Sequence, residues 1–526
     1  MLDVRDHGVY ARGHLLFAVN APYWRLELDV GNLVPRRDTR IVVVDGGQDE
    51  NTAQDAASKL AALGYPGVEV LSGGLAAWRA AGLEVFTGTN VPSKAFGELL
   101  EEDLNTPHIE AQDLHDRLAR GERLVVVDSR TPEEFAAFSI PGAHSLPGAE
   151  LVYRIEEVAP SADTLVVVNC AGRTRSILGA QTLINAGLPN RVVSLRNGTM
   201  AWLQAGYTLD SGRTSTVPEP SAAHREHARQ RAEAMARRAG VQVIDRAKLQ
   251  ALVDDTARTV FRFDVRGREE YQAGHLPGFR HAAGGQLVQA TDEYIGVRHA
   301  RVVLADWDGV RALTTAAWLS QLGGLDVYVY PVGTPEPLQT GPEPRVLLPS
   351  PHPEVPWALP SVAHQAAEAG QAVLLDIDDS VAYARAHAAG ARFSAPSHVL
   401  RVIAGLPEHQ GVLLLSRDGV LARVAAQEAS QRTGRVIRPV LGGTAGWVAA
   451  GLPTGAGREG VLSGADDTWP GPYVFDSLEE RNQNFDEYLA WELGLVEQLQ
   501  RHGETGMSLS GSLRAPADVA AHRATF

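Results

Sequence analysis

One layout of strands and turns occurs four times in this chain of 526 residues. Each copy opens with an apolar strand that ends in Asp, and an aromatic residue stands seven positions later. The opening residues are Asp3, Asp128, Asp264 and Asp376, and the aromatic residues are Tyr10, Phe135, Tyr271 and Tyr383. A second apolar strand follows at a nearly constant distance and ends at Asp45, Cys170, Asp306 or Ser416. Agreement at this many landmarks indicates one kind of domain repeated along the chain.

The remainder of each copy indicates the fold class. A short loop with Gly follows the second strand, and an Ala-rich amphipathic stretch and a third strand lead to a Gly-rich turn. That turn ends in Trp78, Trp202 or Trp447, whereas the third copy keeps only Val332 and Gly333. Apolar strands alternating with helical stretches predict α/β domains, each an open, mainly parallel sheet with helices on both faces. We place four tandem domains at residues 1–90, 108–210, 240–335 and 358–455.

The segments between and after the copies are rich in Pro, Ser and charge. Residues 211–230 and 333–360 are typical of linkers, and we expect residues 223–240 to form a solvated linker helix. Residues 461–526 form a tail whose helical part is amphipathic, which predicts packing on a domain or on a partner. The first copy has only two residues before Asp3. We therefore expect either a start upstream or a domain without its first helix and most of a strand.

The composition excludes several classes of protein. A single cysteine allows no intramolecular disulfide and no four-thiolate metal site, which indicates a reducing compartment. We find no leader-like start and no apolar run near the roughly 20 residues of a bilayer span, so we expect a soluble cytoplasmic protein. The net charge of -15 argues against nucleic acid or a membrane surface as a partner. No dinucleotide or nucleotide-binding loop and no metal-ligand cluster is evident, so we expect no cofactor and no metal.

The single thiol stands where chemistry is expected in such a sheet. Cys170 ends a buried strand and precedes a polar loop and a helix, and ligands of parallel sheets bind beyond the carboxyl ends of the strands. A free thiol has a pKa of about 8.5, and helix N-termini and nearby cations lower it to about 3.5 to 7.5. Backbone amides of the loop form a predicted anion nest. We predict Cys170 as the nucleophile, and the substrate-binding residues as Ala171, Gly172, Arg173, Thr174, Arg175 and Ser176.

Other polar and aromatic residues of the second copy receive supporting roles. Asp128, Arg130 and Glu134 are predicted to tie a loop through charge-assisted hydrogen bonds, and Trp202 is predicted to anchor the core or the turn. Arg175 is favoured as a substrate or persulfide ligand over a surface charge, and the role of Arg173 stays open. His144 is expected at the surface, and His275 of the third copy is expected to be structural. A buried Cys that merely packs is the simpler alternative for the thiol.

Three matched blocks resemble the rhodanese (sulfurtransferase) family. They are Asp128 to Ala143 with its counterpart Gly274 to Gly278, the loop Cys170 to Ser176, and the turn Gly198 to Trp202. The resemblance implies four tandem rhodanese-like domains. It also implies that Cys170 attacks the outer sulfur of thiosulfate or a persulfide, holds that sulfur as a persulfide, and passes it to cyanide or a thiol. The acceptor thiol belongs to a small molecule or to a protein.

Two alternatives stay open. Enzymes of the phosphatase and arsenate reductase type use a Cys-x5-Arg loop, but here Arg175 stands after four residues and Ser176 takes the required position. The shorter loop favours sulfur transfer. Asp45, Asp306 and Ser416 replace the thiol in the other copies, so we expect those domains to form walls or docking surfaces. A non-catalytic scaffold or a sulfur or redox sensor is the second alternative.

Overall fold

The computed structural model describes residues 1–526 except 48–50, 215–216, 334–335, 465 and 515–526. The chain divides into two compact units. Unit 1 holds residues 1–89 and 345–471, and unit 2 holds residues 90–344 and 472–526. The first and fourth copies therefore belong to unit 1, and the second and third copies belong to unit 2 together with the part of the C-terminal tail from residue 472 onward.

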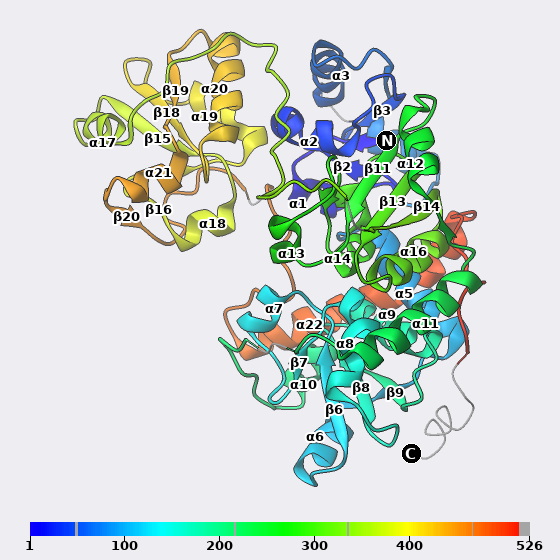
Figure 1. The fold of residues 1–526 in the computed structure, drawn as a ribbon. Coiled ribbons are helices and arrows are strands. Elements are labelled where there is room, and N and C mark those ends of the chain that lie inside the picture. The colour runs from blue at the N-terminus through cyan, green and yellow to red at the C-terminus, as the bar shows by residue number, and fades with distance from the viewer. Residues whose placement is uncertain (48–50, 215–216, 334–335, 465, 515–526) are drawn as a thin grey trace. The chain divides into compact units, whose positions relative to one another are not determined.

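The second copy, which carries Cys170, is built on a five-stranded parallel sheet (Figure 1). Its strands lie in the order β5 (His108–Ile109), β9 (Val192–Leu195), β8 (Leu165–Asn169), β6 (Leu124–Asp128) and β7 (His144–Ser145). Every neighbouring pair is parallel. The sheet is covered by helices α6 (Ala111–Ala119), α7 (Pro132–Ala137), α8 (Leu151–Val158), α9 (Thr174–Asn185) and α10 (Gly198–Gln204). The predicted fold class is confirmed for this copy.

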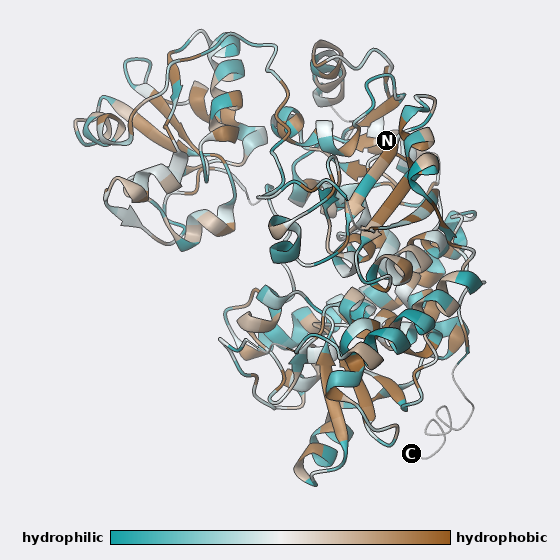
Figure 2. Ribbon diagram, in the orientation of Figure 1, coloured by the Kyte–Doolittle hydropathy of each residue, from teal (hydrophilic) through white to brown (hydrophobic). Residues whose placement is uncertain are grey.

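Alternating burial on the central strands explains why helices cover both faces of this sheet. Val166 and Val168 of β8 belong to a core that is shared with the third copy, whereas Val167 belongs to a separate core with Phe135 and Trp202. Successive side chains of a strand point to opposite faces, so an unbroken run of Val needs an apolar cover on each side. The apolar central strands are visible in Figure 2.

The third copy repeats this sheet, and the first and fourth copies have a four-stranded version of it. The third sheet has the order β10 (Gln242–Val243), β14 (Leu325–Pro331), β13 (Ala300–Asp306), β11 (Val260–Asp264) and β12 (Arg280–His281). The first has β2 (Val19–Asn20), β1 (Leu2–Asp3), β3 (Ile41–Val44) and β4 (Val68–Val70). The fourth has β17 (Arg392–Phe393), β15 (Ala372–Asp376), β18 (Gly411–Leu415) and β19 (Ile437–Pro439), and beside it β16 (His387–Ala388) pairs with β20 (Thr454–Gly455).

Helices of the remaining copies follow the predicted alternation with strands. The first copy has α1 (His7–Ala11), α2 (Leu26–Leu33), α3 (Thr52–Ala62) and α4 (Gly74–Ala80). The third has α12 (Arg246–Asp254), α13 (Arg268–Ala273), α14 (Gly284–Gln289), α15 (Thr291–Tyr294) and α16 (Arg311–Leu322). The fourth has α17 (Pro360–Glu368), α18 (Ser380–Arg385), α19 (Val399–Ala404), α20 (Val420–Thr433) and α21 (Gly443–Ala449). No helix among the described residues is long and apolar enough to span a bilayer.

The predicted solvated linker helix is wrong. Helix α11 (Ala222–Arg238) buries Ala228, Ala232 and Met235 in the core shared by the second and third copies. It packs against both α8 and α16. The small side chains at helical spacing form a face that packs closely against its neighbours. The many charged residues on the other faces of the helix make this apolar face hard to recognise in the sequence.

The C-terminal tail forms two helices that pack on the second copy. They are α22 (Leu478–Leu493) and α23 (Leu495–His502). Phe485 and Leu489 of α22 form an apolar cluster with Met200, and α23 packs on α5 (Val91–Leu104), which precedes the second copy. The prediction of an amphipathic helix that packs on a domain is confirmed.

Candidate active site

Cys170 stands between the end of β8 and the start of α9. Its side chain is buried, and the residue is 2% exposed. The thiol Sγ lies 3.5 Å from Ser176 Oγ, and the Ser176 hydroxyl in turn donates to the carbonyl of Arg173 at 2.8 Å. The thiol therefore lies inside a short loop that is closed by the hydrogen bond from the Ser176 side chain to the Arg173 carbonyl.

The Gly-rich turn before Trp202 packs directly against the backbone of this loop. Gly198 has φ 53°, and a Cβ on it would lie 2.3 Å from the carbonyl oxygen of Cys170. The next amide, that of Thr199, donates to the same carbonyl at 3.0 Å. Trp202 is 3% exposed and donates from Nε1 to the carbonyl of Thr208 at 2.9 Å. The repeated glycine is thus needed because only a residue without a side chain fits against the loop.

The third copy shows which backbone amides hydrogen-bond to a side chain at the position of Cys170. Asp306 takes the place of Cys170 there, and its carboxylate accepts hydrogen bonds from the backbone amides of Gly309, Val310 and Ala312 at 3.0, 3.2 and 2.7 Å. By the repeat, these amides correspond to Arg173, Thr174 and Ser176 in the second copy. Backbone amides of the kind that the sequence predicts as a nest therefore hold the carboxyl group of Asp306 in the third copy, where burial and the neighbouring charge of Asp308 raise its pKa to about 8.

The two other replacements also accept a backbone amide among the described residues. Asp45 accepts from the amide of Ala53 at 3.0 Å, and the hydroxyl of Ser416 accepts from the amide of Ala422 at 3.2 Å. Each replacing side chain is buried. In every copy that lacks a thiol, the replacing polar side chain thus accepts at least one hydrogen bond from a backbone amide that follows it.

Arg175 is bound to Glu134. Its guanidinium donates to both carboxylate oxygens at 2.7 Å. Burial would raise the pKa of Glu134, but the hydrogen bonds and charge of Arg175, with the amide of Thr131, lower it to about 2. The third copy has the same bidentate pair between Arg311 and Glu270, at 2.6 and 2.8 Å, although it lacks a thiol. This pair is therefore a feature of the fold that does not depend on the nucleophile.

Arg173 is also fully engaged. It donates to Glu98 of α5 at 2.8 and 2.6 Å, to Glu101, and to the side chain of Asn197 at 3.0 Å. Burial raises the pKa of Glu98 to about 7, against the lowering effect of Arg173. The role of Arg173, which the sequence leaves open, is therefore structural. The Arg173 guanidinium joins helix α5 to the loop.

The predicted tie between Asp128 and Arg130 is present. Arg130 donates from Nε and one terminal nitrogen to the two oxygens of Asp128 at 2.9 and 2.8 Å, and also to the carbonyl of Phe138 at 2.7 Å. Both side chains are fully buried. Glu134 caps α7 by accepting from the amide of Thr131, in addition to binding Arg175. The three residues fix the loops around β6, as charge-assisted hydrogen bonds are expected to do.

The pKa of the thiol differs in direction from the expected one. Burial raises the pKa of Cys170, and the charge of Arg175 and the hydrogen bond of Ser176 oppose this only in part. The expectation relied on two free arginines, but the carboxylates of Glu134 and Glu98 neutralise them. A buried thiol with compensated cations loses its proton less readily than a free one.

Two histidines were assigned from sequence alone. His275 is buried, stacks on Tyr271 with ring centroids 3.8 Å apart, and its Nδ1 lies 2.8 Å from the carbonyl of Tyr271. It is structural, as expected. His144 lies in β7 and is half-buried, and burial lowers its pKa. The expectation of a plain surface residue is wrong because this short strand is part of the sheet.

Residues of the C-terminal tail lie on the Cys170 loop, and sequence reasoning missed them. The Tyr473 hydroxyl donates to the carbonyl of Ala171 at 2.9 Å. Thr174 Oγ1 donates to Glu492 at 3.2 Å, and Tyr488 lies beside Gly172. An amphipathic pattern shows that a helix packs somewhere but does not identify the surface that it covers.

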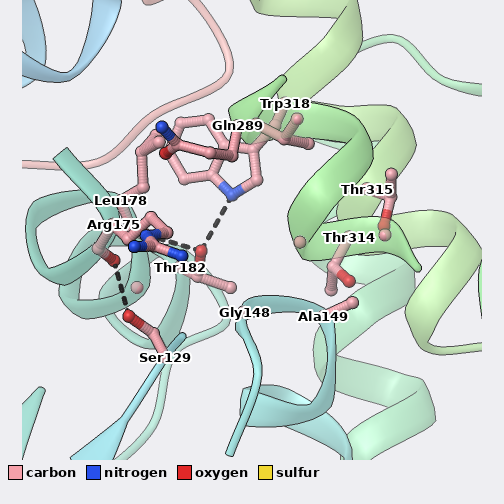
Figure 3. A pocket seen from close by; sticks show the side chains of 14 residues that line it. Ser129, Gly148, Ala149, Arg175, Leu178, Thr182, Gln289, Thr314, Thr315 and Trp318 are labelled. Atoms are coloured by element: carbon pink, nitrogen blue, oxygen red, sulfur yellow. Dashed lines mark hydrogen bonds between the residues drawn. The ribbon is translucent and has the colours of Figure 1, made fainter. Parts of the chain in front are cut away.

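A cavity of about 40 Å³ lies next to Arg175, between the second and third copies (Figure 3). Its lining includes Ser129 and Thr182 of the second copy and Thr315 and Trp318 of the third, and Trp318 donates to Thr182 at 2.8 Å. A water needs at least roughly 10–15 Å³ of such space, so the cavity suits a few waters. It is too small for a thiol substrate together with its hydration.

Comparisons with known proteins identify the family of this chain. The rhodanese-like domain family matches residues 1–81, 110–205 and 245–336, which together are more than half of the chain. The chain belongs to the rhodanese family. The fourth copy lies outside these three matches, but its sheet has the same strand arrangement as that of the first copy.

Two relatives of this rhodanese are informative. A crystal structure of a thiosulfate sulfurtransferase from Pseudomonas aeruginosa is 42% identical, with a TM-score of 0.90, and covers 98% of this chain and 96% of that one. A sulfurtransferase from Allochromatium vinosum is 37% identical over 101 residues, which are 19% of this chain and 92% of that protein. The first likeness thus includes all four copies and the tail, whereas the second has the size of a single domain.

Proposed function

We propose that this protein is a rhodanese-type sulfurtransferase that carries sulfane sulfur on Cys170. The observation that carries the proposal is the carboxylate of Asp306 in the amide nest of the third copy. A carboxylate oxygen lies one bond beyond Cγ, as the outer sulfur of a persulfide lies one bond beyond Sγ. The Asp306 oxygens therefore take the place that the outer sulfur of a Cys170 persulfide would take, and the similarity to two sulfurtransferases supports the same activity.

The reaction needs two displacements at sulfur. The Cys170 thiolate attacks the outer sulfur of thiosulfate or a persulfide donor, the S–S bond of the donor breaks, and sulfite or a thiolate leaves with the electron pair. The loop amides stabilise the resulting anionic persulfide. Cyanide or an acceptor thiolate then attacks the outer sulfur, and Cys170 leaves as a thiolate. Since the chain has a single cysteine, no internal thiol resolves the persulfide and the acceptor is external.

The alternatives have less support from the site. A phosphatase or arsenate reductase loop uses its arginine to bind an oxyanion, but Arg175 is bound to Glu134 and Ser176 occupies the position of that arginine. A scaffold or sensor requires no amide nest around the thiol. Asp45, Asp306 and Ser416 cannot form a persulfide, so sulfur transfer is assigned to the second copy alone.

Sulfur transfer is tested by assaying thiosulfate:cyanide activity and persulfide formation in the wild type and in Cys170→Ser. We expect the wild type to gain one sulfur atom and to form thiocyanate, and the variant to do neither. Activity that survives in Cys170→Ser would refute the catalytic assignment. Hydrolysis of an aryl phosphate without persulfide formation would favour the phosphatase alternative instead.

A further inference from the structure

The C-terminal cap, which we define as residues 472–502, is part of the surroundings of the Cys170 loop. Tyr473 donates to the carbonyl of Ala171, and its hydroxyl lies 2.6 Å from Thr199 Oγ1. Phe485 and Leu489 pack with Met200, which lies on the other side of the loop carbonyls. The cap is thus held both by apolar packing and by hydrogen bonds to the residues that follow Cys170.

Helix α22 places a carboxylate against this loop. Glu492 Oε1 accepts from Thr174 Oγ1 at 3.2 Å and from the Tyr488 hydroxyl at 3.1 Å. A Cβ built on Gly172 would lie 3.5 Å from Glu492 Oε2 and 3.3 Å from the ring of Tyr488. Gly172 is two residues from the nucleophile, so the second oxygen of Glu492 faces the backbone of the sulfur-carrying loop.

That second oxygen has no hydrogen-bond partner, although Glu492 is 1% exposed. Both donors approach Oε1, which leaves Oε2 as a buried acceptor without a donor. Buried carboxylate oxygens are almost always satisfied, because an unmade hydrogen bond costs stability. Glu492 Oε2 is therefore available to accept a hydrogen bond from a donor group of a bound substrate.

Most charges around the loop compensate one another. The three arginines nearest the thiol each bind a carboxylate: Arg130 binds Asp128, Arg173 binds Glu98, and Arg175 binds Glu134. Lys94 Nζ lies 4.8 Å from the ring centroid of Trp491, and burial lowers its pKa. Among the described residues around the loop, Glu492 Oε2, Asn169 Oδ1 and Arg130 Nη1 are buried without a hydrogen-bond partner, and Glu492 Oε2 is the one of these that lies against Gly172.

We propose that Glu492 determines the specificity of the sulfur-transfer site and that it selects a cationic or N–H-bearing acceptor thiol over an anionic one. The inference rests on the proposed function of Cys170. The Oε2 atom accepts a hydrogen bond from an ammonium or amide of the acceptor while its thiolate attacks the outer sulfur of the persulfide. The carboxylate also repels an acceptor that carries its own carboxylate.

The test compares two acceptor thiols, cysteamine and 3-mercaptopropionate, with the persulfide enzyme prepared beforehand and verified by mass. The value of kcat/KM for cysteamine is divided by that for 3-mercaptopropionate, and this ratio is measured in the wild type, in Glu492→Gln, and in Glu487→Gln as the control. Glu487 is an exposed carboxylate on the same helix. Since the ratio within each variant is compared, differences in intrinsic thiol reactivity cancel. We expect the ratio to fall by about tenfold in Glu492→Gln and to stay unchanged in the control.

A second measurement uses the wild type alone, in case the variant does not fold. The acceptors are paired with neutral amides, namely cysteamine with N-acetylcysteamine and 3-mercaptopropionate with its amide. We expect kcat/KM, calculated per thiolate, to be highest for the cationic acceptor, lower for the neutral amides and lowest for the anionic acceptor. An unchanged ratio in a folded Glu492→Gln variant, or an anionic preference in the wild type, would overturn the proposal. A wild type that forms no persulfide at all would instead overturn the proposed function.

Discussion

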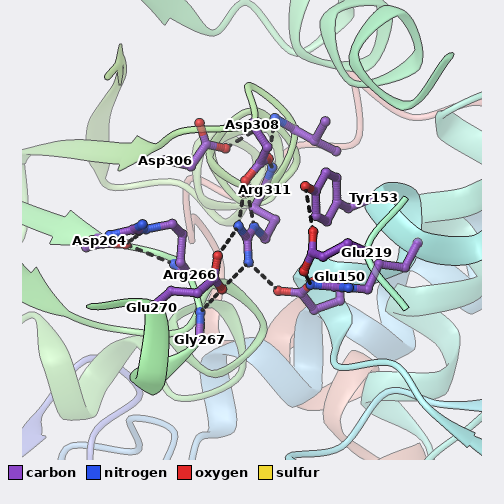
Figure 4. A network of polar contacts seen from close by, with 12 residues as sticks. Glu150, Tyr153, Glu219, Asp264, Arg266, Gly267, Glu270, Asp306, Asp308 and Arg311 are labelled. Carbon is purple, nitrogen blue, oxygen red and sulfur yellow. Dashed lines mark hydrogen bonds and ion pairs between the residues drawn. The ribbon is translucent and has the colours of Figure 1, made fainter. Parts of the chain in front are cut away.

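Asp306 fills, with its own carboxylate, the amide nest that in the second copy surrounds Cys170. Figure 4 shows the surroundings of Asp306, where Arg311 joins Asp308, Glu270 and, from the second copy, Glu150. The loop of the third copy thus has a structural role, because Arg311 binds Glu150 of the neighbouring second copy at 2.7 Å.

Replacing Asp306 should weaken the third copy without stopping sulfur transfer. Asp306→Ala removes the acceptor of the Gly309 and Ala312 amides, whereas the Val310 amide keeps Asp308 as an acceptor, and each unsatisfied buried donor costs about 1–3 kcal/mol. We expect a loss of at least about 1 kcal/mol in the free energy of unfolding, measured with urea, and persulfide formation at the wild-type level. The control is Asp163→Ala, because the Asp163 side chain is 85% exposed. Equal stability of the two variants would contradict the role given to Asp306.

Releasing Arg175 should strengthen binding of an anionic donor. Glu134→Gln leaves the guanidinium without its carboxylate, so the positive charge near Cys170 is no longer neutralised. We expect the KM for thiosulfate to fall several-fold, which corresponds to about 1 kcal/mol of added attraction. Glu133→Gln is the control, since Glu133 is exposed and precedes Glu134 in the same helix. A KM that rises in Glu134→Gln would mean that the intact pair itself binds the donor.

The second copy should also lose stability in acid through Glu134. Its folded pKa of about 2 lies below the ordinary value, so its ion pair stabilises the fold above the unfolded pKa. The stabilisation is lost as the pH falls from about 4.5 to about 2. We expect Glu134→Gln to flatten the dependence of the thermal midpoint on pH in that window. Identical acid profiles for the wild type and this variant would contradict the assignment.

Reaction of the thiol should increase with pH above neutrality. Burial raises the pKa of Cys170, so the thiolate fraction is small at pH 7 and grows as the pH approaches and passes the raised pKa. We expect the rate of persulfide formation at low thiosulfate to rise continuously from pH 7 to beyond pH 9. A rate that is already constant between pH 6 and 8 would show a lowered pKa instead.

The C-terminal cap should control access to Cys170. Phe485→Ala removes a fully buried ring from the cluster with Met200, and such changes cost about 3–5 kcal/mol locally. We expect iodoacetamide to alkylate Cys170 faster in this variant, because the loop is covered by fewer contacts. Leu478→Ala is the control, since Leu478 is 67% exposed at the start of the same helix. Unchanged alkylation in a folded Phe485→Ala would contradict a covering role.

Much of the fold was predictable because its determinants are local. Runs such as Val166 to Val168 specify strands buried on both faces, and the repeat places Cys170 at a strand end. The partners of Arg173 and Thr174 were not predictable, since Glu98 and Glu492 reach the loop from segments far away in the sequence. The direction of the Cys170 pKa was wrong for the same reason: charge compensation depends on tertiary contacts. Small residues such as Ala228 and Ala232 gave too weak a signal to mark α11 as a core helix.

The mass of the peptide that contains Cys170, measured after exposure to thiosulfate or to a low-molecular-weight persulfide, tests the central claim most directly. Since Cys170 is the only thiol of the chain, a persulfide has a single possible site. We predict a gain of one sulfur atom that disappears, with thiocyanate formed, when cyanide is added. A peptide that gains no sulfur from any donor, although the thiol is reduced and the protein folded, would contradict the account.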